Sequence, residues 1–204
     1  MSATMPIDSA RAATLRFRVG IARPGTMHYM YCADLVRRRY LERYQVVVEP
    51  RPDLFVTAWD NTRHSPTFGR TLGVAGLTAA TEAPMVSEEY LDTPVEQACA
   101  ALGWPGTERG SVAEMGPLVS KHPGTGLFLM RNLPRVAAHI GYDFLLSTLP
   151  GRLLDLAKAA GWEFHILTNS RPPGTFPDDR GTFSPGARTG VLRCGQSAVL
   201  AAAA

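Results

Sequence analysis

The residues with the clearest chemical potential lie in a glycine-containing turn. Residues 120–126 have the sequence Ser-Lys-His-Pro-Gly-Thr-Gly, and a helical pattern follows from Leu127. The first turn of a helix leaves backbone N–H groups without acceptors, and the helix dipole makes this end positive. A phosphate or pyrophosphate can therefore bind there without any particular side chain. The turn predicts an anion cradle at Gly124 and Gly126 and favours a ligand of the nucleotide type.

One carboxylate stands out in the segment before this turn. Glu114 lies among Val112, Ala113, Met115 and Leu118, in a stretch that we predict to be a central strand. Burial disfavours the charged form of a carboxyl group, so we expect its pKa to be raised. A carboxylate of this kind is a candidate proton acceptor. The alternative is a structural carboxylate that pairs with an arginine.

The sequence offers little for other common chemistries. Five histidines are scattered without the spacing of a zinc site, so we predict no metal: His28, His64, His122, His139 and His165. Neither a Gly-x-Ser-x-Gly elbow nor a lysine-bearing phosphate loop is present. Cys32, Cys99 and Cys194 are odd in number and widely spaced, which indicates reduced and mostly buried thiols.

Composition narrows the class of partner. The chain has 204 residues and a formal net charge of +3, from 21 Lys plus Arg against 18 Asp plus Glu. This charge is too small to indicate nucleic-acid binding and suits anionic small ligands better. The N-terminus lacks a long apolar core, and no run of about 18 apolar residues occurs. We therefore expect a cytoplasmic protein without stable membrane insertion.

Hydrophobic periodicity in the first half indicates strands, helices and a hairpin. A period of two predicts strands at residues 15–22, 54–59 and 70–77, the last two forming an antiparallel hairpin. Steps of three and four predict a helix from Thr26, which is a plausible N-cap, and helical segments at 87–91 and 94–102.

The second half alternates strands and helices. The pattern predicts strands at 111–119, 142–148 and 162–168, with helices at 127–140 and 150–160 between them. This alternation indicates parallel pairing through right-handed crossovers. We predict an α/β (α+β) fold, with a mixed central sheet, antiparallel N-terminal strands, parallel C-terminal strands and flanking helices. Residues 1–170 form the predicted domain, and the Pro/Gly-rich residues 171–204 a C-terminal extension.

This order of elements resembles the GNAT acyltransferase fold over residues 15–168. Two segments resemble the thermostable hemolysin family: residues 90–96 match its Tyr-Leu-Asp-x-Pro-Val-Glu, and residues 112–118 resemble its Val-x-Glu-Val-Gly-Asn-Leu. The chain lacks that family's Arg-Asn-x-Phe motif at 150–160 and its Trp-Gly-x-Tyr-Tyr segment near the C-terminus. Acyl-homoserine lactone synthases share this fold and use acyl carrier protein.

The resemblance implies an N-acyltransferase that moves an acyl group from a thioester to the amine of a small metabolite. The donor would be acetyl-CoA or another acyl-CoA, or an acyl carrier protein. The strands at 111–119 and 142–148 would splay apart and bind the pantetheine arm through their backbone. The implied arm-binding residues are Met115, Gly116, Leu118 and Val119. The implied phosphate-binding residues are Lys121, Gly124, Thr125, Gly126 and Leu127.

The same resemblance suggests which groups perform the chemistry. Glu114 would be the general base that removes a proton from the amine, with Glu82 as its substitute. A backbone N–H near Gly116 would polarise the thioester carbonyl, and Gly116-Pro117 would break the strand locally. Three polar residues could protonate the thiolate, although each is also explained as structural: Tyr142, Ser147 and Thr148.

Several alternatives stay open at this point. The protein could bind coenzyme A without catalysis, or be a membrane-active, hemolysin-like protein. Residues 37–39 are all arginine, which is either a solvated helix face or a docking site for an acidic carrier protein. A homodimer is also left open. We expect no nucleic-acid partner.

Overall fold

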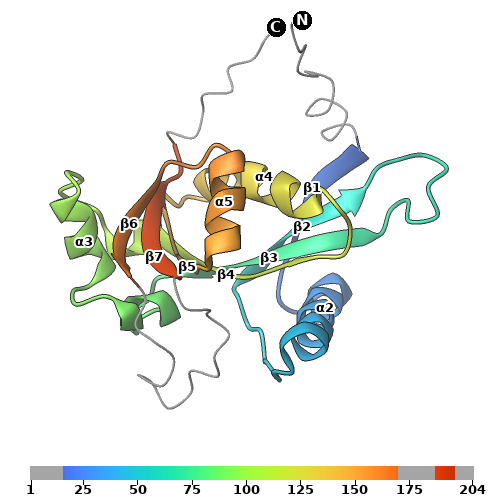
Figure 1. Ribbon diagram of the computed structural model, residues 1–204, viewed down its shortest axis with the longest axis horizontal. Coiled ribbons are helices and arrows are strands. Elements are labelled where there is room, and N and C mark those ends of the chain that lie inside the picture. Colours follow the sequence, from blue (N-terminus) through green and yellow to red (C-terminus); the bar gives the residue numbers. More distant parts are fainter. Residues whose placement is uncertain (1–15, 170–186, 196–204) are drawn as a thin grey trace, which may run out of the picture.

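The computed structural model describes residues 16–169 and 187–195. These residues form one mixed sheet in the strand order β1-β2-β3-β4-β5-β7-β6, with helices on both faces (Figure 1). The strands are β1 (Phe17–Ala22), β2 (Leu54–Asp60), β3 (Thr71–Ala79), β4 (Val112–Ser120), β5 (Phe144–Leu149), β6 (Phe164–Asn169) and β7 (Arg188–Arg193). The helices are α2 (Met27–Tyr44), α3 (Val95–Ala101), α4 (Thr125–His139) and α5 (Gly151–Ala159), with the short 3₁₀ helices η1 (Val86–Tyr90) and η2 (Arg109–Ser111).

The N-terminal half has the predicted antiparallel arrangement. β1, β2, β3 and β4 pair in sequence order, and each pair is antiparallel. Helix α2 begins after Thr26, whose hydroxyl accepts a hydrogen bond from the Tyr29 amide, as expected of an N-cap. Its buried stripe includes Cys32 and Val36, which pack with Phe55 of β2 against one face of the sheet. The pattern of steps of three and four thus correctly predicted both the helix and its buried face.

Helices α4 and α5 cover the opposite face (Figure 1). Leu129 and Leu133 of α4 are fully buried there, together with Val56 of β2 and Leu145 of β5. The start of α4 lies very close to β3 at Gly73. A Cβ at Gly73 would be 2.7 Å from the Thr125 Cγ2 atom, so only glycine allows this approach. This contact fixes where the amides of the first turn of α4 point.

The C-terminal strands differ from the sequence prediction. β7 lies between β5 and β6 and is antiparallel to both, so β6 does not pair with β5. The assignment of everything after residue 170 to an extension outside the domain is wrong for β7, whose Thr189, Val191 and Leu192 are buried in the sheet. The remainder of that predicted extension, 171–186 and 196–204, lies outside the described residues. The predicted fold class, a mixed sheet with flanking helices, is confirmed.

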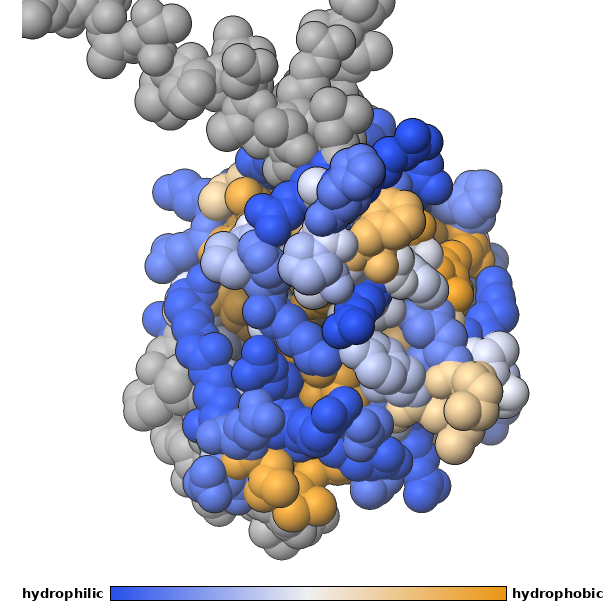
Figure 2. All heavy atoms as spheres, turned by 90° about the vertical axis from the view of Figure 1, so that its right-hand side faces the viewer, coloured by the Kyte–Doolittle hydropathy of each residue, from blue (hydrophilic) through white to orange (hydrophobic). Residues whose placement is uncertain are grey.

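Strand β1 is the edge of the sheet next to the β2–β3 hairpin. Val19 and Ile21 of β1 are each 37% exposed, and Arg18, directly before Val19, is also exposed. Figure 2 views this side of the molecule and shows a mostly hydrophilic surface with separate hydrophobic patches. Charged side chains on an edge strand disfavour pairing with another chain. Among the described helices, none has the length and apolar character needed to span a bilayer.

Candidate active site

The central feature of the site is a fork between two parallel strands. β4 and β5 pair only at Val112 with Phe144, Ala113 with Leu145, and Glu114 with Leu146. Both strands continue beyond this point, but they diverge, and only the Ser147 hydroxyl still reaches across, 3.3 Å from the Met115 carbonyl. Because the outer edges of both strands are paired elsewhere, the two inner edges face a gap. The predicted splay of these strands is confirmed.

A β-bulge in β4 opens the fork. Met115 pairs with Leu77 and Leu118 pairs with Ala75, so two residues of β4, Gly116 and Pro117, oppose one residue of β3. A bulge bends its strand, and proline cannot donate a hydrogen bond to a neighbouring strand. The predicted break at Gly116-Pro117 is therefore observed, and it turns β4 away from β5.

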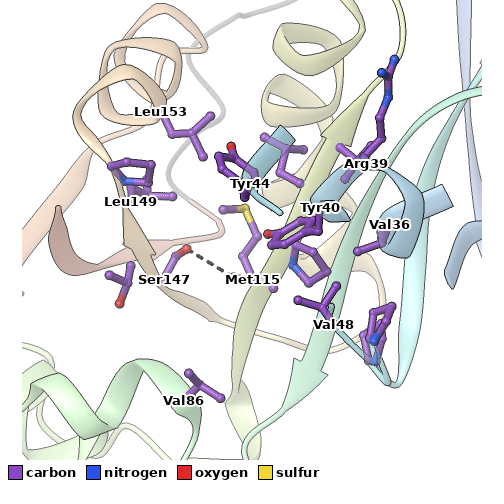
Figure 3. A pocket seen from close by; sticks show the side chains of 18 of the residues that line it. Val36, Arg39, Tyr40, Tyr44, Val48, Val86, Met115, Ser147, Leu149 and Leu153 are labelled. Atoms are coloured by element: carbon purple, nitrogen blue, oxygen red, sulfur yellow. Dashed lines mark hydrogen bonds between the residues drawn. The ribbon is translucent and has the colours of Figure 1, made fainter. Parts of the chain in front are cut away.

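A cavity of about 880 Å³ occupies the fork and the space above it (Figure 3). Its floor is residues 114–120 of β4 and residues 147–150 at the end of β5. Its walls are the C-terminal half of α2, the loop at 46–52, the first turns of α5, and the start of η1. Segments distant in the sequence thus converge on one space, at the point where the sheet is open.

Glu114 lies at the closed end of the fork. Its carboxylate accepts hydrogen bonds from the Ser87 hydroxyl at 2.6 Å, the Ser87 amide at 2.8 Å and the Val86 amide at 3.2 Å. Burial raises the pKa of Glu114, and these three hydrogen bonds from η1 only partly oppose that shift. No arginine bonds this carboxylate within the described chain, so the alternative of an arginine partner is not what the structure has.

The arginine partner belongs to a different carboxylate. Arg109 bonds both oxygens of the buried Glu88, at 2.9 and 2.7 Å, and also reaches Glu96 at 3.1 Å. The amides of Met85 and Val95 donate to the same Glu88 carboxylate. This network holds η1 in place, and η1 in turn holds Ser87 over the site. The motif at 90–96 thus contributes Glu96 to the support of the site.

Glu82, the substitute base, is not part of the site. It is exposed in the loop after β3 and does not line the cavity. Ser147 and Thr148 do line it, whereas Tyr142 does not. Glu114 is therefore the predicted base that the fold places in the cavity, and its role remains to be tested.

The turn at 120–126 leads into the start of α4, as predicted, and two amides there are unbonded among the described residues. Gly124 has φ +83°, which favours glycine, and directly precedes α4. Within the described chain, the Gly126 and Leu127 amides have no acceptor, as expected at a helix start. The Lys121 amide is already bonded to the Leu72 carbonyl at 2.8 Å, so its inclusion among the cradle amides is wrong.

The Lys121 side chain also points elsewhere. Its ammonium lies 3.1 Å from the Tyr31 hydroxyl on α2.

Thr125, the first residue of α4, has the one buried side-chain oxygen in the described chain without a hydrogen-bond partner. Of the predicted binding residues, Met115, Gly116, Leu118, Val119 and Gly126 line the cavity; Lys121, Gly124, Thr125 and Leu127 do not.

Tyr40 on α2 was missed by the sequence analysis. Its ring lines the cavity, and its hydroxyl has no hydrogen-bond partner within the described chain. Figure 3 shows this hydroxyl pointing into the cavity between Met115 and Tyr44. Burial raises the pKa of Tyr40 to about 12, so its hydroxyl keeps its proton. The only sequence signal was an aromatic residue on the apolar face of a helix, which also describes ordinary core.

A second tyrosine joins the two sides of the cavity. Tyr44, one turn after Tyr40, accepts a hydrogen bond from Arg152 of α5. The guanidinium groups of Arg43 and Arg152 lie 5.8 and 5.9 Å from the centre of its ring. With Arg39 these groups give one side of the cavity a positive charge, which favours anionic ligands.

Comparison with known proteins agrees with this architecture. The thermostable hemolysin family model matches residues 22–180, well over half of the chain. The chain belongs to the thermostable hemolysin family. No curated protein is similar enough in sequence to match this family member.

Solved structures share the fold of this thermostable hemolysin family protein. FeeM, an N-acyl amino acid synthase from uncultured soil microbes, has a TM-score of 0.57 at 11% identity, covering 89% of this chain and 93% of its own. TofI, solved in a ternary complex with an inhibitor and MTA, has 0.56 at 13%, covering 87% and 91%. LasI, an acyl-homoserine lactone synthase, has 0.55 at 12%, covering 87% and 90%. At these identities the likeness establishes the GNAT-like fold.

Proposed function

We propose that this protein is an N-acyltransferase that moves an acyl group from an acyl-CoA or acyl carrier protein thioester to the amine of a small metabolite. The observation that carries the proposal is the fork itself. Two neighbouring strands have unpaired inner edges, and a half-buried carboxylate with a raised pKa, that of Glu114, lies where the strands meet. The names of FeeM and LasI, which make N-acyl products, support the same class of reaction.

The donor arm would lie along β4. Pantetheine carries amide groups that can bond the unpaired backbone of residues 115–119 as an added strand would. Its phosphate would meet the free amides of Gly126 and Leu127 at the positive end of α4. From Met115 to the end of β4 at Ser120, the extended strand spans about 16 Å, which suits an extended arm, and the turn at 121–124 then leads to α4.

The reacting thioester would then lie beside Glu114. An ammonium has no lone pair, so Glu114 accepts a proton from the amine, directly or through a water molecule. The amine nitrogen attacks the thioester carbonyl carbon, a C–N bond forms, and the C–S bond breaks. The nitrogen loses its second proton as the amide forms, and the leaving thiolate takes up one proton, so the products are the amide, a free thiol and the proton held by Glu114. The Tyr40 hydroxyl and the amides near the bulge are available as hydrogen-bond donors to the carbonyl oxygen.

Direct binding tests the proposal. Calorimetry of the full chain with free coenzyme A, acetyl-CoA and longer acyl-CoA thioesters should show binding, because the arm and phosphate sites are common to all of them. Coenzyme A and acyl carrier protein present the same phosphopantetheine arm. An acylated carrier protein should therefore be tested for binding as well. Absence of binding in both arms would overturn the proposal.

The name of the family raises a second activity, lysis of membranes. The same protein preparation should be added to liposomes loaded with a self-quenched dye. Leakage without any interaction with thioesters would favour the lytic activity over acyl transfer. A variant of Glu114 separates the two further, since proton removal from an amine has no part in leakage.

A further inference from the structure

The cavity has more apolar wall than the groups proposed above require. Val36 and Tyr40 of α2, Val48 and Pro52 of the following loop, and Pro117 of β4 all line it on the α2 side. Figure 3 shows the side chains of Val36, Tyr40 and Val48 facing the same space. We call this set the valine wall. Apart from the Tyr40 hydroxyl, it consists of apolar side-chain atoms.

A space of this size is larger than the voids of a packed protein interior. Interiors are normally packed as densely as organic crystals. At about 880 Å³, the cavity lies near the upper end of the range of about 300–1,000 Å³ that ligand sites occupy. The pantetheine arm and a small amine are polar, and an acetyl group adds only one methyl group. The valine wall therefore needs another occupant, and that occupant must be apolar.

We infer that the transferred group is a medium- or long-chain fatty acyl group whose hydrocarbon chain lies against the valine wall. The inference rests on the proposed acyl transfer, because the thioester at the fork fixes where the chain would begin. It deepens that proposal by naming the class of acyl donor.

Neither the closed end of the fork nor the core under α4 has room for the hydrocarbon chain. Straight ahead, the strands close at the pair of Glu114 and Leu146. On the α4 side, Leu145, Leu129 and Leu133 are fully buried in the core and leave no room. The cavity extends instead between the first turns of α5 and the C-terminal half of α2, where the valine wall lies.

Polar groups in the cavity mark a different place for the amine. Glu114 and Ser87 are hydrogen-bonded to each other at the η1 end of the cavity. Figure 3 shows Val86 of η1 apart from Val36 and Val48 of the valine wall. One cavity thus has a polar end beside the proposed base and, beside α2, the apolar valine wall with Arg39 and Arg43 next to it. An amphiphilic donor would use both, with its carbonyl near Glu114 and its chain against α2.

Chain length is the variable that tests this inference. Calorimetry should compare free coenzyme A with its acetyl, butanoyl, octanoyl and dodecanoyl thioesters on the full chain. We expect affinity to rise at least tenfold from acetyl to octanoyl, with an upper limit of about fourfold per buried methylene. A separate arm uses free octanoate and dodecanoate, because a fatty chain could also come from a free acid.

Substitution of the wall supplies the matched control. Val48→Trp should fill the space and remove the gain for octanoyl-CoA while leaving the affinity for free coenzyme A unchanged. Leu41→Trp is the control, since Leu41 lies on α2 next to Tyr40 but is 49% exposed and outside the cavity. If Val48→Trp does not fold, Val46→Trp replaces it, and the chain-length series on the unaltered protein stands independently.

The outcomes are separable. A gain with chain length that Val48→Trp abolishes and Leu41→Trp preserves supports the inference. Equal affinity for acetyl-CoA and dodecanoyl-CoA overturns it and leaves the proposed acyl transfer intact. Binding of free dodecanoate together with no binding of any thioester overturns both this inference and the proposed acyl transfer, since the cavity would then hold a free fatty acid.

Discussion

At the scale of single residues, the site depends on how few partners two side chains have. Glu114 is held by Ser87 and Val86, and the Tyr40 hydroxyl is held by nothing in the described chain. A half-buried carboxylate held only by neutral donors keeps a raised pKa and can still exchange a proton. Tyr40 is only half-buried, so its hydroxyl can bond a bound ligand without giving up a hydrogen bond within the described chain.

Glu114 gives a prediction about pH. A base works only when deprotonated, and the raised pKa of Glu114 moves the acidic limit of activity upward from that of an ordinary carboxylate. Glu114→Gln should lower the rate of acyl transfer by about 10²-fold or more and abolish the loss of activity at acidic pH. Its affinity for coenzyme A should stay the same. Release of free thiol in the presence of amine acceptors, followed across pH, measures both effects. Glu82→Gln is the matched control, and an unaltered pH profile in Glu114→Gln would reject the role.

Tyr40 gives a prediction that separates function from stability. Tyr40→Phe removes a hydroxyl without a protein partner, so the free energy of unfolding should not fall, whereas affinity or turnover with an acyl thioester should fall about two- to tenfold. Tyr29→Phe is the contrast, because the Tyr29 hydroxyl donates to the Pro52 carbonyl at 2.6 Å. That variant should lose about 1 kcal/mol of stability. Urea unfolding and calorimetry distinguish the two, and equal ligand binding by Tyr40→Phe and the parent protein would contradict the prediction.

At the scale of elements, the fork exists because each of its strands has a second neighbour. β4 is held by β3 and β5 is held by β7, so both can diverge without leaving the sheet. The bulge at Gly116-Pro117 supplies the bend, and η1 closes one end under the Glu88–Arg109 pair. The open site is therefore maintained by paired outer edges rather than by contacts across the gap.

The β6–β7 pairing gives a prediction at Gly190. A Cβ at this position would collide with the His165 carbonyl and approach the Phe164 ring to 2.7 Å. Gly190→Ala should therefore destabilise the protein by about 1–3 kcal/mol through overpacking. Gly110→Ala is the control, because a Cβ there has no neighbour within 4 Å. Thermal and urea unfolding measure the difference in free energy of unfolding between the two variants. Equal stability would show that β7 can shift to accommodate the added methyl group.

At the scale of the whole molecule, one sheet carries both the antiparallel half and the fork. The three hydrophobic clusters lie on both faces of this sheet, under α2, under α4 and α5, and under α3. Loss of a central strand would therefore expose more than one cluster. A cytoplasmic location and a homodimer stay predictions.

Truncation tests whether the sheet needs β7 to fold. A chain that ends at residue 170 lacks β7, so β5 and β6 lose their common partner and Val191 and Leu192 leave the core. We expect this chain to aggregate or to bind a hydrophobic dye, because a buried sheet edge and apolar surface become exposed. A chain that ends at Gly195 keeps every described strand and should unfold cooperatively. Cooperative unfolding of the shorter chain would show that β7 is dispensable.

The sequence alone determined every described element except β7 and the short η2. Alternating and helical periodicities set the strands and helices, because burial of one face imposes a period of 2 or 3.6 along the chain. Local chemistry also placed the turn at 120–126, the break at Gly116-Pro117 and Glu114 on a buried strand. These features depend on neighbours within a few residues.

Only the tertiary structure decided which distant groups share the site. β7 has six residues, including one glycine, and arginine at both ends, so its local pattern does not indicate a central strand. Its burial follows from pairing with β5 and β6, which lie much earlier in the chain. Tyr40 and the valine wall likewise join Glu114 only because α2 packs beside the open fork. Periodicity shows which face of an element is buried, whereas long-range packing decides what that face meets.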